Sequence, residues 1–246
     1  MKIGLLQTGR FPEEMLDQYG DYNNMFERFL AGRALDMVTY AVLDGVLPDS
    51  VDEAEGWLIT GSRVGVYEAY DWIPPLENFI REAYARAVPI VGICFGHQIL
   101  ARALGGKVEK FPGGWSIGNK HYSFEGFPDG IRLLAWHQDQ VIEAPADATV
   151  IGSSPFCKYA ALRYGDKAFS IQAHPEFTAD FLADLLELQR HFLPSDIVMQ
   201  ANAELQTSTA SREIADWIEN FLKQNQLRNT TAAVQPRRSL TTGRDL

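Results

Sequence analysis

The sequence predicts an α/β fold built on a doubly wound, mostly parallel sheet. Short apolar segments rich in β-branched residues alternate with segments of helical periodicity along most of the 246 residues. A chain of this length can bury one large core, or one core with a small satellite. Its composition, 46% hydrophobic and 22% charged, is that of an ordinary globular protein.

Strands are expected where apolar runs are short, and helices where apolar residues recur every three or four positions. Pro74 and Pro75 fit the first turn of a helix, where a missing N–H breaks no bond. Thr178 and Asp180 are potential caps of a later helix. In chain order we expect strands at residues 2–7, 36–41, 57–60, 90–93, 107–110, 117–124, 131–136, 148–151, 159–162 and 168–171, and helices at 22–31, 72–87, 98–104, 181–193, 197–203 and 214–222, with a loop and a short helix at 11–20.

The other elements are arranged around a strand–turn–helix unit at residues 88–106. Ile90, Val91 and Ile93 form a short β-branched run, which predicts a buried strand. Apolar residues then recur at helical spacing from 98 to 104. Gly105 follows and ends the predicted helix.

Cys94 lies at the join between this strand and helix, inside Gly92-x-Cys94-x-Gly96. Glycines two residues before and after a nucleophile suit a tight elbow, because no side chain then crowds the strained backbone. The helix N-terminus favours the thiolate, and it offers the N–H of Phe95 to a developing oxyanion. The alternative is a buried core cysteine, which is commoner for a lone Cys.

A second motif, His174-Pro175-Glu176, supports a reactive Cys94. His174 could take the thiol proton, and Glu176 could orient its imidazole. Residues two apart in an extended segment lie on the same face, so both side chains can point toward the elbow.

Residues 92–98 and 173–177 together resemble the class I glutamine amidotransferases, which use a Cys, His and Glu triad. The resemblance covers roughly residues 1–190, and it is closest to single-domain members similar to the GMP synthase amidotransferase domain. It implies a flavodoxin-like sheet, with a small antiparallel side sheet formed at residues 107–124. It also implies thiolate attack on a γ-glutamyl amide to give a thioester, which water hydrolyses.

The resemblance also implies an oxyanion hole formed by Phe95 together with the turn after the third strand. The family usually has Gly-Gly-Pro at that turn, whereas this chain has Gly61-Ser62-Arg63. Gly61 keeps the tight turn and Ser62 can still donate its N–H, although an ordinary strand-to-loop turn is the alternative. Arg63 is either a solvated charge or a contact for a second carboxylate, on a substrate larger than glutamine.

Four further residues are expected at the substrate by the same resemblance. Gln98 follows the elbow, and His137, Gln138 and Asp139 lie in a loop that covers the glutamine site in relatives. The alternatives are a plain helix-surface glutamine at position 98 and a surface or packing histidine at position 137.

The remaining chemistry-bearing residues are interpreted as structural. Cys157 could pair with Cys94 in principle, but it lies in an apolar, strand-like run and is expected to be inert core. His121 and His191 have no partner motif. We find no His/Cys cluster with metal-ligand spacing and no Walker-type phosphate loop, so neither a metal nor another cofactor is expected.

Charge and hydropathy limit the partners and the location. A formal net charge of −10 argues against a nucleic acid partner. No apolar run approaches the roughly 20 residues of a membrane span, and the first residues become polar too soon for a signal peptide. A low cysteine count fits the reducing cytoplasm. From about residue 228 the chain turns polar, so we expect a domain at 1–226 and a flexible tail at 227–246.

The sequence is compatible with three functions. The chain could be an amidotransferase subunit that passes ammonia to a separate synthetase, since no ATP-binding or acceptor domain is recognised in it. It could instead be a free-standing γ-glutamyl hydrolase or peptidase. A catalytically silent binding protein is the third, and the intact Cys94, His174 and Glu176 argue against it. A Cys-type α/β-hydrolase is disfavoured because its acid usually precedes its histidine.

Overall fold

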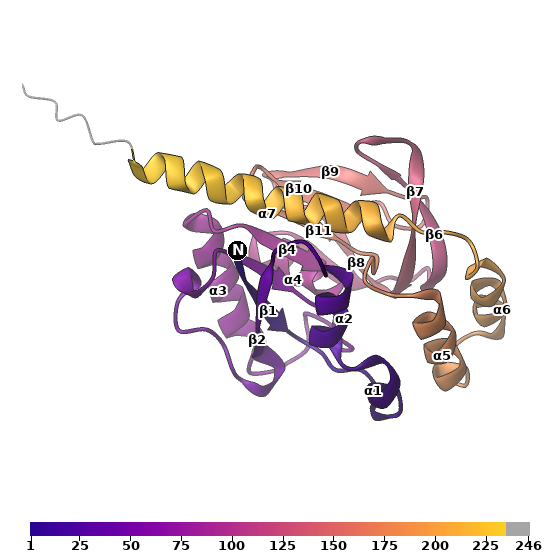
Figure 1. Ribbon diagram of the computed structural model, residues 1–246. Coiled ribbons are helices and arrows are strands. Elements are labelled where there is room, and N and C mark those ends of the chain that lie inside the picture. The colour runs from indigo at the N-terminus through magenta and orange to yellow at the C-terminus, as the bar shows by residue number, and fades with distance from the viewer. Residues whose placement is uncertain (235–246) are drawn as a thin grey trace, which may run out of the picture.

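A computed structural model describes residues 1–234, and the side chains of residues 1–225. Nine strands form the main sheet in the order β2-β1-β3-β4-β11-β10-β9-β6-β7, and β5 pairs with β8 in a separate two-stranded sheet (Figure 1). The strands are β1 (Lys2–Gln7), β2 (Asp36–Ala41), β3 (Gly56–Ile59), β4 (Ile90–Ile93), β5 (Lys107–Lys110), β6 (Ser116–Phe124), β7 (Phe127–His137), β8 (Asp139–Glu143), β9 (Ala148–Ser153), β10 (Ala161–Tyr164) and β11 (Ala168–Ile171).

Helices cover both faces of this sheet, which confirms the predicted doubly wound α/β fold. They are α1 (Glu13–Tyr19), α2 (Tyr22–Phe29), α3 (Ile73–Ala85), α4 (Phe95–Ala103), α5 (Ala179–Gln189), α6 (Ser195–Glu204) and α7 (Ser211–Val234), with short 3₁₀ turns at Val42–Asp44 and Val51–Glu53. Alternate strand residues enter opposite cores. Leu5 packs with residues of α2, α5 and α7, whereas Leu6 packs with residues of α3 and α4.

The parallel part of the sheet positions the site. β3, β4 and β11 are neighbours and run in the same direction, with Ile59 opposite Gly92 and Ile171 opposite Ile93. The three segments that follow these strands therefore leave the sheet at one edge, as expected for open α/β sheets. These segments carry Gly61, Cys94 and His174.

The side sheet differs from the prediction in its membership. Residues 107–110 do form a strand, but β5 pairs with β8 and not with residues 117–124. β6 instead joins the main sheet, where it pairs with β7 along most of its length. Burial explains this difference, because Ile117, Tyr122 and Phe124 of β6 lie in the main core.

Several element ends also differ from the prediction. Thr178 caps α5 as predicted, its hydroxyl accepting from Phe181 N at 3.2 Å. α5 ends at Gln189, not at 193, and residues 190–194 turn before α6 begins. α7 continues to Val234, past the predicted domain boundary at 226, and residues 235–246 of the predicted tail lie outside the described part of the chain.

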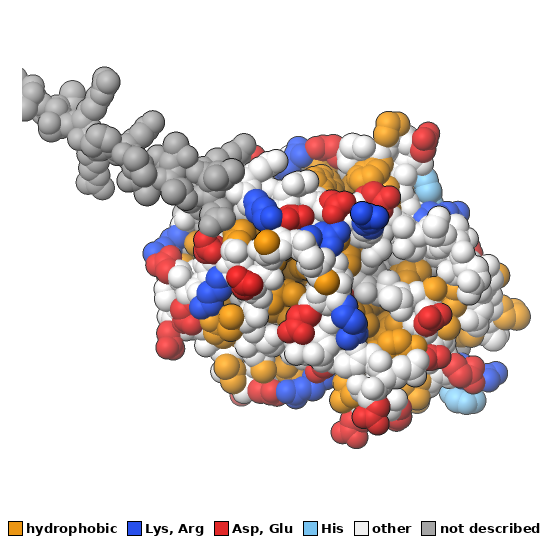
Figure 2. Space-filling view, viewed as in Figure 1, with side chains coloured by type: hydrophobic (Ala, Val, Ile, Leu, Met, Phe, Trp, Pro, Cys, Tyr) orange, Lys and Arg blue, Asp and Glu red, His pale blue; other side chains and the backbone are white. Residues whose placement is uncertain are grey.

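Charged side chains of both signs are interspersed over the face shown in Figure 2. Within the described residues no helix is both long and apolar enough to cross a membrane.

Candidate active site

Cys94 occupies a strained elbow between β4 and α4. Its backbone has φ 53° and ψ −103°, a conformation that non-glycine residues rarely adopt. The flanking glycines have no room for a side chain. A Cβ on Gly92 would lie 2.4 Å from the carbonyl oxygen of Gly96, and a Cβ on Gly96 would lie 2.3 Å from that of Ile59. The predicted need for glycine at both positions is thus a steric one.

His174 and Glu176 form a buried pair beside this elbow. His174 Nδ1 lies 2.7 Å from Glu176 Oε1, and both side chains are almost fully excluded from solvent. The backbone N–H of His174 donates to Leu134 O at 2.8 Å. The imidazole ring of His174 stacks on the Phe177 ring, with the two centroids 4.0 Å apart. These contacts fix the plane of the imidazole.

The charges around His174 favour its protonated form. Burial alone lowers the pKa of this histidine, but the neighbouring Glu176 and Cys94 outweigh burial and raise that pKa. A hydrogen bond with the Cys94 side chain contributes to the rise. Because Nδ1 is engaged by Glu176, Nε2 is the ring nitrogen left to interact with the Cys94 sulfur.

The turn after β3 lies against the same histidine. A Cβ on Gly61 would come within 2.9 Å of His174 Cε1 and 2.8 Å of the Tyr22 hydroxyl. Thr8 holds the turn in place, with its hydroxyl 3.0 Å from Thr60 O and 3.1 Å from Gly61 O. Ser62 Oγ donates back to Thr8 O at 2.7 Å.

The same turn packs against the first residues of α4. Gly96 N donates to Thr60 O at 3.1 Å. Phe95 is the first residue of α4, where an amide N–H has no acceptor within its own helix. The structure therefore brings the three predicted oxyanion-hole residues, Phe95, Gly61 and Ser62, next to Cys94 and His174.

A cavity of about 360 Å³ opens above Cys94 and His174. Six residues singled out from the sequence line it: Ser62, Arg63, Gln98, His137, Gln138 and Asp139. His121 and His191 do not line it. The structure thus gathers the predicted substrate residues at one cavity, and their contact with substrate stays a prediction.

The side-chain amide of Gln98 is held by two hydrogen bonds within the protein. Its Nε2 donates to the carbonyl oxygen of Asp139 at 2.9 Å and to Gln172 Oε1 at 3.1 Å. Both amide hydrogens are therefore directed to protein acceptors, and Oε1 is the atom left for a ligand. The side chain ties α4 to the end of β11 and to the segment that follows β7.

His137 is buried and neutral. Its Nδ1 lies 3.2 Å from Asp139 O, so Nδ1 carries the proton because a carbonyl oxygen can only accept. Burial lowers the pKa of His137 to about 3. Its Nε2 is buried without a hydrogen-bond partner, which leaves an acceptor close to His174.

Asp139 is a half-buried carboxylate in the cavity wall. Burial raises its pKa, against the lowering effects of the Tyr67 hydroxyl and of Lys110. Burial and the same contact raise the pKa of Tyr67 to about 12. Gln138 points its amide to Phe111 O at 3.3 Å, so its side chain helps to hold this loop against residue 111.

Sequence reasoning did not identify Tyr22 as part of the site. Tyr22 begins α2, and its hydroxyl lies close to Gly61. Asp21 caps this helix, accepting from Tyr22 N at 2.8 Å, while its own N–H donates to Asn24 Oδ1 at 3.2 Å. An Asp followed three residues later by Asn is a recognisable capping signal, but nothing in it indicates the distant Gly61.

Cys157 is buried and unlike Cys94 in its surroundings. It lies in a turn before β10, with Ser154 N donating to its carbonyl oxygen at 2.9 Å, and not in the predicted strand-like run. Burial raises the pKa of this thiol to about 12, so it resists ionisation. Both cysteines are free thiols.

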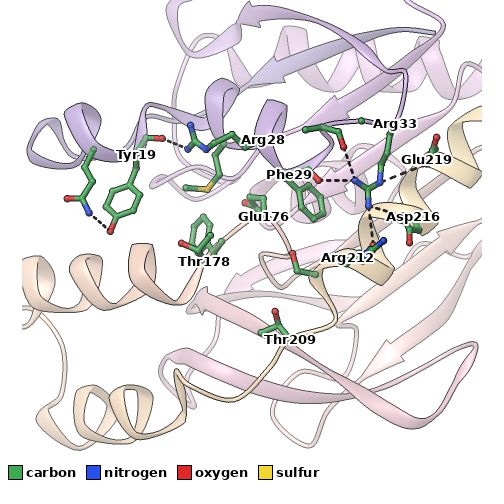
Figure 3. A pocket seen from close by; sticks show the side chains of 16 residues that line it. Tyr19, Arg28, Phe29, Arg33, Glu176, Thr178, Thr209, Arg212, Asp216 and Glu219 are labelled. Atoms are coloured by element: carbon green, nitrogen blue, oxygen red, sulfur yellow. Dashed lines mark hydrogen bonds and ion pairs between the residues drawn. The ribbon is translucent and has the colours of Figure 1, made fainter.

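A wider groove of about 1020 Å³ has Glu176 among its lining residues (Figure 3). Arg28, Arg33 and Arg212 line the same groove and are labelled in Figure 3. Arg33 is engaged, 2.7 Å from Asp216 and 3.9 Å from Glu219. Although this groove is larger, neither Cys94 nor His174 lines it, so we assign the chemistry to the smaller cavity.

Comparison with known proteins shows the family of this chain. The family model "Glutamine amidotransferase class-I" matches residues 16–184. The chain therefore belongs to the class I glutamine amidotransferase family, which confirms the resemblance seen in its motifs.

Among its relatives are γ-glutamyl peptidases of Arabidopsis thaliana. Gamma-glutamyl peptidase 4 is 32% identical over 225 residues, covering 83% of this chain and 88% of that protein. Gamma-glutamyl peptidase 3 is 28% identical over 223 residues, covering 83% of this chain and 90% of that protein. The GMP synthase of Streptococcus pneumoniae strain P1031 is 33% identical over 174 residues, but the match covers 63% of this chain and only 32% of that enzyme.

Solved structures share the fold. A glutamine amidotransferase from Thermotoga maritima superimposes with a TM-score of 0.71 at 21% identity, covering 92% of this chain and 98% of that one. A glutamine amidotransferase from Methylobacillus flagellatus gives the same score and identity, with 92% and 94% coverage.

Proposed function

We propose that this chain is a free-standing hydrolase of γ-glutamyl amides that acts through a thioester on Cys94. The observation that carries this proposal is the buried His174–Glu176 pair, 2.7 Å apart, beside a cysteine held in a strained elbow at the base of a cavity. The match covers 88% and 90% of the two γ-glutamyl peptidases but only 32% of GMP synthase, which favours the peptidase activity over delivery of ammonia to a synthetase.

In the first step His174 takes the thiol proton and the Cys94 sulfur attacks the γ-carbonyl carbon. The carbonyl π electrons move onto oxygen, where the N–H groups of Phe95 and of the Gly61–Ser62 turn stabilise the charge. The C–N bond then breaks, and His174 returns the proton to the leaving amine. Glu176 holds the imidazole in position and stabilises its protonated form.

In the second step water replaces the sulfur. His174 takes a proton from the water as its oxygen attacks the thioester carbon. The C–S bond breaks, glutamate leaves, and the sulfur regains its proton. Cys94 must be reduced for this cycle, so we place the protein in a reducing compartment, the cytoplasm.

The second candidate is an amidotransferase subunit that delivers ammonia to a separate synthetase. The similarity to a third of GMP synthase favours it, because that enzyme is glutamine-hydrolysing by name. Such a subunit would be held back until its synthetase binds. The third candidate is a catalytically silent binding protein. Such a protein would have no need for a strained Cys94 beside a paired histidine.

Glutamate release by the purified chain tests the proposal. We expect the isolated protein to hydrolyse a γ-glutamyl dipeptide at least as well as glutamine, and the Cys94→Ala variant to be inactive on both. Inactivity of the wild-type chain on every γ-glutamyl compound, with glutaminase activity appearing only when a synthetase is added, would establish the subunit function instead.

A further inference from the structure

The cavity above Cys94 is lined by both polar and apolar side chains. Gln98, His137 and Asp139 are among the polar ones. The γ-glutamyl group carries an ammonium and a carboxylate, so it needs polar partners of this kind. Apolar lining residues, here called the apolar wall, include Phe11, Trp115, Trp136, Leu185, Phe192 and Leu193. Such a wall suits an apolar group beyond the scissile bond.

Part of this apolar wall lies beyond the stretch that the family model matches. The family model matches residues up to 184, and Leu185, Phe192 and Leu193 come after it. The chain turns back at the end of α5, where Phe192 N donates to Gln189 O at 2.9 Å. This turn brings Phe192 and Leu193 to the cavity.

Phe192 stands at the rim and is 80% exposed. A second hollow of about 390 Å³ shares Pro12, Arg63, Gln189 and Phe192 with the first. The cavity therefore continues over Phe192, away from the sulfur. A large exposed aromatic at the edge of a binding cavity is a surface that a ligand can cover.

Arg63 stands at the same rim, and no carboxylate lies within ion-pair distance of it among the described residues. Arg10 also lines the cavity, but it is ion-paired with Asp44 and lies 3.7 Å from Asp21. Arg63, Tyr22 and Cys94 line the same cavity. Cys94 adds to the rise in the pKa of the buried Tyr22 hydroxyl, and the positive charge of Arg63 opposes that rise.

We propose that the leaving amine is an α-amino acid with a bulky apolar side chain. The side chain packs on Phe192, Leu193 and the tryptophans, and the α-carboxylate pairs with Arg63. The substrate class is thus a γ-glutamyl dipeptide with an apolar second residue. This inference rests on the proposed hydrolase function and assigns its specificity.

The second hollow limits the length of the substrate. Glu13 and Glu14 line it together with Arg63. A chain that extended further and ended in a carboxylate would place its charge near these two carboxylates, which disfavours it. Ammonia, the leaving group of glutamine, would leave the apolar wall and Arg63 without contacts.

Four substrates separate the two contacts: γ-glutamyl-phenylalanine, γ-glutamyl-phenylalanine amide, γ-glutamyl-glycine and γ-glutamyl-glycine amide. We expect kcat/KM to be highest for γ-glutamyl-phenylalanine. Phe192→Ala should lower it by about tenfold for the phenylalanine compounds, as for lost apolar groups in other substrate pockets, and barely for the glycine compounds. Arg63→Gln should remove the preference for each acid over its amide.

Two matched variants control for surface changes. Met199→Ala removes another exposed apolar side chain, on α6. Arg86→Gln removes another exposed cation, 3.5 Å from Glu82. Neither residue lines the cavity, so both variants should retain the wild-type order of substrates.

The outcomes distinguish the specificity from the activity. If the wild-type protein cleaves γ-glutamyl-glycine as efficiently as γ-glutamyl-phenylalanine, or if Phe192→Ala affects all four substrates equally, the specificity is wrong and the hydrolase function stands. If the Arg63→Gln variant still prefers each acid over its amide, the proposed contact between Arg63 and the α-carboxylate is ruled out. If no γ-glutamyl compound is cleaved, the hydrolase function itself fails, and this inference with it.

Discussion

His97 Nδ1 lies 2.7 Å from the Ser170 hydroxyl, and both side chains are fully buried. His97 belongs to α4, the helix that starts after Cys94, and Ser170 belongs to β11, the strand that leads to His174. Beside it, Gln98 donates to Gln172 at 3.1 Å. Two buried hydrogen bonds therefore join the segment carrying the nucleophile to the segment carrying the base.

Removing the His97 contact should disturb the alignment of the sulfur and the imidazole. We predict that His97→Ala lowers kcat for γ-glutamyl hydrolysis by roughly tenfold to a hundredfold, because small misplacements of reacting groups are costly. KM should change little, since His97 does not line the cavity. Steady-state kinetics would show this, with Ser170→Ala as the partner in a double-mutant cycle. Additive effects of the two substitutions would contradict a shared role.

Buried neutral histidines should make stability depend on pH. Burial lowers the pKa of His97 and of His137 to about 3, whereas an unfolded histidine titrates near 6.5. The unfolded chain therefore binds more protons between these values, and the contribution of both residues is complete above pH 6.5 and is lost as pH falls. The raised pKa of His174 makes stability depend on pH above 6.5, so it adds nothing to the slope of stability against pH below that value.

We accordingly predict that the melting temperature falls as the pH is lowered from 6.5 to 5. The melting temperature of the His97→Gln variant should fall less steeply than that of the wild type. Thermal melts monitored by circular dichroism at three pH values would measure both slopes. Equal slopes for the two proteins would show that His97 does not contribute.

The two cysteines should differ in reactivity. A glutamine-like chloroketone should label Cys94, which stands at a helix N-terminus in the cavity, and leave Cys157 unmodified. Peptide mapping by mass spectrometry would locate the label. Modification of Cys157 at a comparable rate would overturn the assignment of the nucleophile.

His174 and Glu176 should contribute unequally to turnover. His174→Ala removes the proton acceptor, whereas Glu176→Gln keeps the geometry and only weakens stabilisation of the imidazolium. Glu176→Gln should lower kcat by less than the roughly 10⁴-fold known for loss of the orienting carboxylate in serine proteases. The reason is that a thiol ionises more easily than a hydroxyl and needs less help from its base. A greater loss in kcat for Glu176→Gln than for His174→Ala would reverse the proposed roles.

Local signals explain why much of the site could be predicted from the sequence. The elbow depends on Gly92 and Gly96, whose positions two residues from Cys94 are visible in the chain. His174 and Glu176 are likewise two apart. Parallel β3, β4 and β11 then bring these segments to one edge of the sheet, as the α/β pattern predicts.

Long-range partners could not be predicted in this way. Gln98 bonds to Asp139 and Gln172, which are 41 and 74 residues away, so its engagement with the protein is set by the tertiary fold. The pairing of β5 with β8 and the turn that presents Phe192 depend in the same way on distant packing. No local pattern encodes these contacts.

Trapping the acyl-enzyme tests the central claim most directly. The protein is mixed with γ-glutamyl-phenylalanine, quenched in acid within the first turnovers, digested, and measured by mass spectrometry. We predict that the peptide containing Cys94 gains the mass of one glutamyl group, that hydroxylamine removes it, and that Cys94→Ala shows neither adduct nor turnover. Hydrolysis that proceeds in Cys94→Ala, or an adduct on any other residue, would contradict the mechanism.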